Sequence, residues 1–545
     1  MTDDVTQFTL IDEPWILVQF HDGRTAELSL TGAFEQATEI RRVVGELPTQ
    51  AFAITRLLLA ILHRATPERI DKAAWVDFWE NEQFPLADIR DYLHHWSDRF
   101  DLLHPETPFY QVADLRTEKG EFTELERLIG DAPTGSPFLT TRLRDALTSL
   151  SFAEAARWVV HCQAFDVSGI KSGAIDDKRV KDGKGYPIGM GSAGHIGGIL
   201  LEGENLLQTL LLNFVPFDSD SDLLAHSDND SAAWEHVPAD GPAPLHVEDG
   251  ERPYLVKGVV EMLTWQSRRI RLRSDGQGVR EVLICNGDRF TPANAHRVEA
   301  MTAWRLSEPQ AKKLGVPEAY MPRVHTPDRA LWRGLKSLLT SVQGEGLQPA
   351  TIRWVSELSE DILPPEYVPH VRAIGIDYIN NSSVTGEVIN DEIDVPVQVL
   401  QSEREDLRST VLAAVKDADR ASESYANLTD NLDRAAGGDG GSAVKDAARA
   451  EAFAALDPQF RRWIAQLGNP TVTAPDAGDA WATAARRLLL ELGGQAVAAA
   501  GPAAWIGRKT SKTNDRHLDS GLAESWFLTS LYSIFPDLAI PKESA

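Results

Sequence analysis

The pattern of apolar and polar positions divides the chain into a mixed first part and a helical last part. Near the start, residues 8–20 (FTLIDEPWILVQF) are rich in strand-forming side chains, and a turn at residues 21–24 leads into a second short run. Together they predict an N-terminal hairpin. Residues 47–64 are apolar around most of a helical surface, as a buried helix requires. From residue 397 onward, helical periodicity recurs in four segments separated by glycine-rich or proline-containing breaks.

These elements predict the fold class and the domain organisation. Short strands and helices mix as far as residue 394, and helices joined by loops follow. We therefore expect a large mixed α/β N-terminal domain at residues 1–394 and an all-α C-terminal four-helix bundle at residues 395–545. A chain of 545 residues is too long for one typical core, which agrees with this division.

A glycine-rich stretch, residues 165–213, is the most unusual part of the chain. It holds ten glycines between Gly169 and Gly203, interleaved with cationic side chains at Lys171, Lys178, Arg179, Lys181 and Lys184. Glycine allows positive φ and lets another backbone approach closely, so this composition suits a loop that contacts a polymer or a phosphate. The residues alone leave open a flexible, solvated loop.

Within this stretch, residues 189–194 (GMGSAG) fit the glycine spacing of a dinucleotide-binding fingerprint. That motif needs a buried strand before it and a helix after it. Here charged residues precede the glycines and His195-Ile196-Gly197-Gly198 follows, which is a poor start for a helix. We therefore interpret the spacing as accidental.

Composition and charge narrow the function further. With 43% hydrophobic and 25% charged residues the chain has an ordinary globular composition, and its formal net charge of −27 argues against broad coating of nucleic acid. Two cysteines cannot form a disulfide framework or a four-cysteine zinc site, so we predict no metal. We also predict no cofactor, because the dinucleotide-like glycine spacing lacks its strand and helix. The absence of a signal peptide and of a membrane-spanning apolar run predicts a cytoplasmic protein. There is no HExxH motif, Walker loop or GxSxG elbow, so we predict that the chain is not an enzyme.

Several segments, in their order along the chain, resemble a known family. They are LIDEPWILV near the start, the helix at residues 48–63, HPETPFYQV at residues 104–112, the glycine stretch running into LLQTLLLN, Leu263-Thr264-Trp265-Gln266 and Tyr378-Ile379-Asn380-Asn381. Their order and spacing resemble the CasA family, the large subunits of type I-E CRISPR Cascade surveillance complexes, over nearly the whole chain.

The resemblance implies a function and a set of partners. It implies a non-catalytic subunit that recognises the protospacer-adjacent motif in double-stranded DNA, assists duplex opening and recruits a helicase-nuclease. The implied partners are the other Cascade subunits with their guide RNA and the target duplex, without a membrane. In such complexes guide pairing reads the target, and protein reads only the short flanking motif.

The resemblance also assigns roles to two loops. Residues 169–173, which are Gly169, Ile170, Lys171, Ser172 and Gly173, match the family's glycine loop in the minor groove, where shape dominates the reading. On this basis Gly173→Asp should abolish motif-dependent binding and leave the fold intact. A turn-rich loop with Thr134, Gly135 and Phe138 matches the loop that contacts the guide complex and DNA. From the residues alone, Phe138 is favoured as a core anchor.

Two further sites follow from the same resemblance. Arg289, after the turn at residues 286–288, is the candidate for the family's basic finger into the minor groove. The candidate strand-opening hairpin ends in Asn380, Asn381, Ser382 and Ser383, with Ser382 at the wedge position. From the residues alone these four are ordinary turn formers. Arg269, Arg271 and Arg273 alternate along a predicted strand, which favours a solvated strand face over a phosphate track.

Two alternatives from other functional classes stay open. One is a nucleotide-dependent enzyme that uses the glycine-rich stretch, which nucleotide binding by the isolated protein would support. The other is a purely structural scaffold subunit, which would add nothing to the DNA affinity of its complex.

Overall fold

The computed structural model describes residues 7–66, 70–131, 147–217, 223–225, 227–236, 254–341, 346–509 and 517–536. By its internal contacts the chain divides into two compact units. The large unit comprises Met1–Arg329, Thr340–Glu357 and His370–Glu392, and the C-terminal unit comprises Ala330–Leu339, Leu358–Pro369 and Ile393–Ala545. The expected boundary between residues 394 and 395 stays a prediction, because compactness does not test which parts fold independently.

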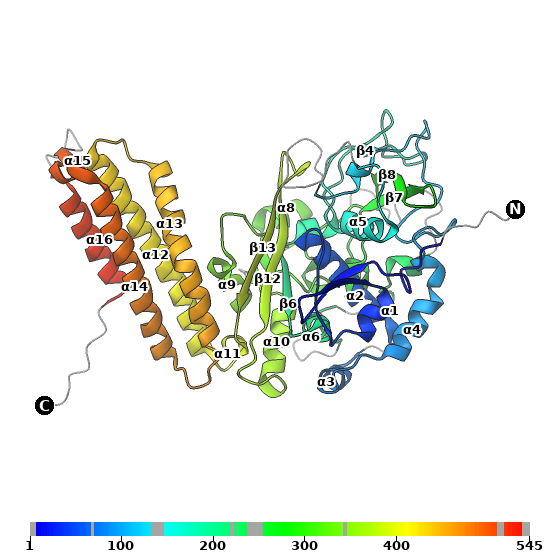
Figure 1. The fold of residues 1–545 in the computed structure, drawn as a ribbon, viewed down its shortest axis with the longest axis horizontal. Helices are drawn as coiled ribbons and strands as arrows, with labels where there is room; N and C mark the ends of the chain where they lie inside the picture. Colours follow the sequence, from blue (N-terminus) through cyan, green and yellow to red (C-terminus); the bar gives the residue numbers. More distant parts are fainter. Residues whose placement is uncertain are drawn as a thin grey trace. The chain divides into compact units, whose positions relative to one another are not determined.

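The large unit mixes helices with short strands (Figure 1). Its helices are α1 (Leu30–Glu35), α2 (Pro48–Ala65), α3 (Lys72–Glu80), α4 (Leu86–His95), α5 (Phe152–Phe165), α6 (Leu206–Asn213), α7 (Val259–Leu263), α8 (Glu308–Leu314) and most of α10 (Ala350–Asp361). Its strands are β1 (Ile16–Phe20), β2 (Thr25–Leu28), β3 (Ile40–Val43), β4 (Lys171–Ser172), β5 (Lys184–Gly185), β6 (Gly198–Glu202), β7 (Arg268–Ser274), β8 (Val279–Asn286), β9 (Trp304–Leu306), β10 (Tyr320–Pro322), β11 (Gly346–Leu347), β12 (His370–Ile379) and nearly all of β13 (Val384–Asp394).

These strands form several small sheets. The orders are β2-β1-β3, β13-β12-β6, β10-β9-β11 and β5-β4-β8-β7. The predicted N-terminal hairpin is confirmed, since β1 and β2 pair antiparallel with Ile16 opposite Leu28. In the last of these sheets β4 pairs antiparallel with β5 and parallel with β8, so it joins the glycine-rich stretch to a strand more than a hundred residues later.

Helix α2 is the centre of the large unit, and its predicted burial is confirmed. It begins with Pro48, whose missing N–H costs nothing in the first turn, and it packs against α4, α5 and α7. Arg56 points from α2 into this core and forms a two-pronged ion pair with Glu299, at 2.8 and 3.0 Å. Both side chains are at most 3% exposed, so each charge depends on the other for its solvation.

The C-terminal unit is helical. It contains α9 (Lys336–Leu339), α11 (Val397–Leu400), α12 (Glu405–Ala436), α13 (Ser442–Gln466), α14 (Ala474–Ala499), α15 (Gly501–Ile506) and α16 (Ser520–Ile534), with a short pair β14 (Arg508–Lys509) and β15 (His517–Leu518). Figure 1 shows α12, α13, α14 and α16 lying side by side, and α12 contacts the other three. Gly493 lets α14 approach Phe527 of α16, because a Cβ there would lie 2.4 Å from the ring.

The predicted fold class, a mixed α/β part followed by a helical bundle, is therefore confirmed. Within the described part of the chain, no helix combines the length and the apolar character needed to cross a bilayer.

The contact between α2 and α5 predicts a pH dependence of stability. His161 of α5 is buried, hydrogen-bonds Thr49 of α2 at 3.0 Å and stacks on Phe165, and burial lowers its pKa to about 4. An unfolded histidine takes up a proton below about pH 6.5, whereas this one stays neutral until about pH 4. The stabilisation is thus complete above the unfolded pKa and is lost as the pH falls toward 4.

We expect His161 to reduce the unfolding free energy by about 2 kcal/mol between pH 7 and pH 5. Urea unfolding of the wild type and of His161→Gln at the two pH values measures this, since the amide can keep the bond to Thr49 without titrating. Equal pH dependence in both proteins would contradict the prediction.

Candidate nucleic-acid interface

The C-terminal end of α5 leads into the glycine-rich stretch and carries a buried carboxylate. Helix α5 begins after Ser151, whose Oγ accepts a hydrogen bond from the backbone of Glu154 at 3.1 Å, and ends at Phe165. The next residue, Asp166, is 10% exposed. Its Oδ2 accepts from Lys171 Nζ at 2.6 Å and also from Arg268 Nε, and these two cations are 11% and 1% exposed. The carboxylate therefore joins α5 to β4 and β7.

The charges of this cluster explain its pKa shifts. Burial raises the pKa of Asp166, but the charges and hydrogen bonds of Lys171 and Arg268 outweigh burial and hold that pKa below its ordinary value. Burial is also the main reason why the pKa of Lys171 is lowered, against the attraction of Asp166. The cluster thus places two cations against one carboxylate in a poorly hydrated site.

Arg268 hydrogen-bonds backbone carbonyls just before the glycine loop and at Gly189, farther along the glycine-rich stretch. Its NH2 group donates to the carbonyl oxygens of Val167 at 3.0 Å and Gly189 at 2.8 Å, and its NH1 group donates to the carbonyl of Ser267 at 2.8 Å. The side-chain amide of Gln163 holds the backbone of Arg268 itself, accepting from its N–H at 2.8 Å and donating to its carbonyl at 3.0 Å. The start of β7 is therefore fixed to α5 by polar contacts.

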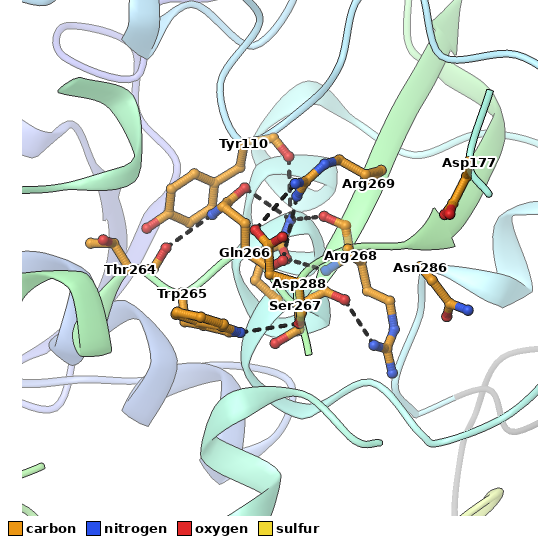
Figure 2. Close-up of polar contacts among 12 residues, drawn as sticks. Tyr110, Asp177, Thr264, Trp265, Gln266, Ser267, Arg268, Arg269, Asn286 and Asp288 are labelled. Atoms are coloured by element: carbon orange, nitrogen blue, oxygen red, sulfur yellow. Dashed lines mark hydrogen bonds and ion pairs between the residues drawn. The ribbon is translucent and has the colours of Figure 1, made fainter. Parts of the chain in front are cut away.

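The residues next to Arg268 build a second buried pair, drawn in Figure 2. Arg269 NH2 lies 3.1 Å from Asp288 Oδ2, and Trp265 Nε1 donates to the Asp288 carbonyl at 3.2 Å. Arg269 and Asp288 are 2% and 1% exposed. The interpretation of a solvated strand face is wrong at Arg269, because this side chain neutralises a buried carboxylate. Farther along β7, Arg271 donates to the Leu115 carbonyl and Arg273 pairs with Glu281.

The glycine loop has an open part and a closed part. Gly169 has no atom within 4 Å of the position of a Cβ, and Ile170 beside it is 53% exposed. Gly173 is buried, and a Cβ there would lie 2.5 Å from the Gly183 backbone. The expectation that Gly173→Asp leaves the fold intact is therefore wrong. Lys171 is held by Asp166, so it is a buried structural cation and not an exposed phosphate ligand.

Strands β12 and β13 form a hairpin whose tip is Asn380–Ser383. Three consecutive tip residues, Asn380, Asn381 and Ser382, have left-handed φ values of 52°, 55° and 63°. Asn380 and Asn381 are exposed, whereas Ser382 and Ser383 are half-buried. The exposed end of the hairpin is thus formed by the two asparagines, one position earlier than the wedge residue assigned from the sequence.

The structure brings the hairpin tip and the glycine loop together. The N–H of Ser168 donates to the carbonyl of Ser382 at 2.7 Å, and the hydroxyl of Tyr378 on β12 donates to the carbonyl of Phe165 at 2.7 Å. A cavity of about 60 Å³ lies beside these contacts, and it is lined by the end of α5 with residues 165–167, by Lys171, by residues 126–130 and by residues 383–385. The predicted loop with Thr134, Gly135 and Phe138 lies outside the described residues.

Other expected cations are distributed differently. Arg179 pairs with Asp177 at 2.8 Å and donates to the carbonyl of Gly287, so it joins the stretch to the end of β8. Lys178, Lys181 and Lys184 are exposed, and so is Arg289. The exposed cations of the glycine-rich stretch are therefore Lys178, Lys181 and Lys184, whereas Lys171 and Arg179 make ion pairs within the fold.

The segment with the dinucleotide-like spacing is not a strand–turn–helix unit. Residues Ser192–His195 form a single 3-10 turn, and a Cβ at Gly191 would lie 2.4 Å from the backbone of Ala164. Glycine is required there because the segment packs directly on α5. Both cysteines are buried free thiols, and within the described ranges no group of His, Cys, Asp or Glu side chains has the arrangement of a metal site.

Sequence reasoning assigned no structural role to the residues that hold this site together. Asp166, Arg268 and Tyr378 lie far apart in sequence. Folding brings Arg268 of β7 and Tyr378 of β12 to the end of α5, where Arg268 binds Asp166 and Tyr378 binds the carbonyl of Phe165. One local signal was available for Asp166, a lone acid that directly follows an apolar helix and precedes a cationic loop. Arg268 gave no such signal, because the alternating pattern along β7 indicated Arg269, Arg271 and Arg273 and not Arg268.

Comparisons with known proteins give a consistent result. The family model described as CRISPR-associated protein Cse1 matches residues 9–492. The crystal structure of Thermobifida fusca Cse1 is 44% identical, covers 98% of this chain and 99% of its own, and superposes with a TM-score of 0.90.

Two more distant matches agree in fold or in sequence. A curated relative from Thermus thermophilus, CRISPR-associated protein CasA/Cse1, is 35% identical over 306 residues, and the match spans 55% of each chain, about half the length of that relative. A chain of a structure described as a CRISPR RNA-guided surveillance complex is 16% identical, covers 96% of this chain and 99% of its own, and has a TM-score of 0.71, so it shares the fold.

The two ends of the glycine loop should respond differently to substitution. Gly173→Ala forces a methyl group against the Gly183 backbone, so we expect a loss of about 1–3 kcal/mol in stability. Gly169→Ala adds a methyl group in open space and should leave the melting temperature nearly unchanged. Thermal unfolding of both variants, monitored by circular dichroism, tests this. Equal melting temperatures would mean that the loop does not pack as described.

Proposed function

The chain belongs to the CRISPR-associated Cse1 family, and from this membership we propose that it is the non-catalytic large subunit of a type I-E RNA-guided surveillance complex. In this role it recognises the protospacer-adjacent motif in double-stranded DNA, assists opening of the duplex and recruits a helicase-nuclease. Its partners are the other Cascade subunits with their guide RNA, and the target DNA. The match to a chain of an RNA-guided surveillance complex supports this proposal through the shared fold.

The observation that carries the DNA-reading role is the contact between the glycine loop and the hairpin tip. The bond from Ser168 to Ser382 places an open loop backbone beside an exposed turn. A thin backbone element beside a projecting turn suits a duplex whose minor groove is read by shape and whose adjacent base pairs are then separated.

Within this surface, exposure separates contacting residues from supporting ones. We propose that Gly169 and Ile170 approach the minor groove, and that Arg289 supplies the basic finger. Lys171, Ser172 and Gly173 form the base of the loop, because β4 is hydrogen-bonded into its sheet on both sides. Their contribution to DNA reading is therefore to hold the exposed part in place.

We assign strand opening to the hairpin tip as a whole. Asn380 and Asn381 are its exposed side chains, and Ser382 holds the turn against the loop through its carbonyl. Planar amide groups can stack on or hydrogen-bond to an unpaired base, whereas a serine side chain is too short to replace a base pair. The wedge is accordingly the pair of asparagines on a backbone set by Ser382.

The first test of this function uses guide-loaded complex reconstituted with and without this chain. On targets that differ only in the flanking motif, we expect the chain to produce a preference of about tenfold or more for the correct motif. Gel-shift titration at fixed salt measures it. Identical binding without the chain would favour the scaffold alternative, and calorimetric binding of ATP or a dinucleotide would favour the enzyme alternative.

A second test separates recognition from strand opening. Replacing Asn381, Ser382 and Ser383 with glycines removes one of the two wedge side chains and both serine hydroxyls without adding bulk, and glycine accepts the left-handed φ of the first two positions. We expect slower opening of fully paired targets, with nearly unchanged binding to targets already unpaired beside the motif. Stopped-flow fluorescence of a labelled duplex measures the opening rate.

The matched control is Gln277→Gly in the exposed turn between β7 and β8, which lies on a different hairpin of the same unit. It should change neither rate nor affinity. Equal losses on paired and unpaired targets for the triple variant would mean that the tip binds the motif or holds the structure and does not open the duplex.

A further inference from the structure

We propose that Asp166 is a positioning residue for the DNA-reading surface, fixing the glycine loop and the hairpin tip relative to one another without touching DNA. The inference rests on the proposed function and deepens it. Its basis is the segment Phe165–Ser168, in which every residue makes a polar contact: Phe165 and Ser168 with the hairpin, Asp166 with Lys171 and Arg268, and Val167 with Arg268.

The first step is the tether from the carboxylate to the loop. A single oxygen of Asp166 holds both Lys171 Nζ and Arg268 Nε. Because Lys171 lies directly after the open residues Gly169 and Ile170, this ion pair closes a short loop at its far end. The six residues from Asp166 to Lys171 are held at both ends by this ion pair and have few accessible conformations. Their exposed part, Gly169 and Ile170, is therefore preorganised for binding.

The second step is the orientation of Arg268. With its Nε bound to Asp166, the guanidinium plane presents NH2 to the carbonyls of Val167 and Gly189. Guanidinium geometry is rigid and planar, so fixing one edge fixes the direction of the others. Through Arg268, Asp166 therefore positions the backbone just before the loop, at Val167, and the backbone at Gly189.

The third step is the connection to the hairpin. The residue before Asp166 accepts a hydrogen bond from Tyr378, and Ser168 donates to the tip at Ser382. If the carboxylate is removed, residues 165–168 lose the anchor between these two contacts. The loop and the tip then become independent, although each can keep its own local fold.

The test must distinguish positioning from plain stability. Asp166→Asn leaves two buried cations without a counter-charge and can prevent folding. Asp166→Asn combined with Lys171→Met removes one charge of each sign, so the cluster keeps the net charge of the wild type. The control is Arg56→Met combined with Glu299→Gln, which removes another buried ion pair of the large unit that makes no contact with the loop or the tip among the described residues.

Two readouts are taken well below the melting temperatures. The first is hydrogen–deuterium exchange at residues 168–173 and 380–383 of the assembled complex without DNA. The second is the ratio of affinities for targets with and without the motif. For the Asp166/Lys171 variant we expect faster exchange in both segments and a ratio reduced by about tenfold, with affinity for motif-free targets unchanged. The control variant should lower the melting temperature and leave both readouts as in the wild type.

The outcomes separate this proposal from the proposed function. A wild-type complex that prefers the motif, together with an Asp166/Lys171 variant that keeps both the ratio and the protection, would overturn the positioning role alone. A wild-type complex without any motif preference would overturn the proposed function and this inference with it. Equal effects of the two double variants on the ratio would show that general destabilisation is the cause, and would also overturn the positioning role.

Discussion

The buried carboxylate of Asp166 is the constraint on which the glycine-rich region depends. Removing a carboxylate from water costs several kcal/mol unless cations and hydrogen bonds replace the lost hydration. Here one ammonium and one guanidinium do so, and they come from elements that are separate in sequence. Helix α5, strand β4 and strand β7 must therefore assemble together, because an incomplete cluster leaves a buried charge without a partner. The cluster thus gives the glycine-rich segment after α5 a defined conformation.

Local patterns were sufficient to predict the long elements of the fold. Short windows of sequence contain the signals for these elements. They are the apolar residues all around α2, the periodicity of the four long C-terminal helices and the turn residues at 380–383. Pairings over long separations have no such local signal, because they depend on which elements meet. The parallel pairing of Ser172 with Cys285 and the contact of Tyr378 with Phe165 belong to this second group.

For the same reason, the chemical character of a residue was a poor guide to its place in the site. Lysine and arginine side chains commonly bind phosphate, yet Lys171, Arg179 and Arg269 all neutralise carboxylates of the same chain. In a protein with a formal net charge of −27, internal acids compete with external phosphates for every cation. Under the proposed function, the chain then contributes shape to DNA reading, and attraction to the phosphates has to come mainly from its partners.

The left-handed run at the hairpin tip has an evolutionary consequence. Side chains branched at Cβ are strained at positive φ, whereas asparagine, aspartate, glycine and, to a lesser degree, serine tolerate it. Asn380, Asn381 and Ser382 all have this conformation. The backbone alone therefore restricts these three adjacent positions to a few amino-acid types, whatever ligand they contact. Lineages that diversify here can exchange amides, carboxylates and hydroxyls, but a valine, isoleucine or threonine requires a different turn. We therefore expect natural variation at the tip to be confined mainly to glycine and small polar residues.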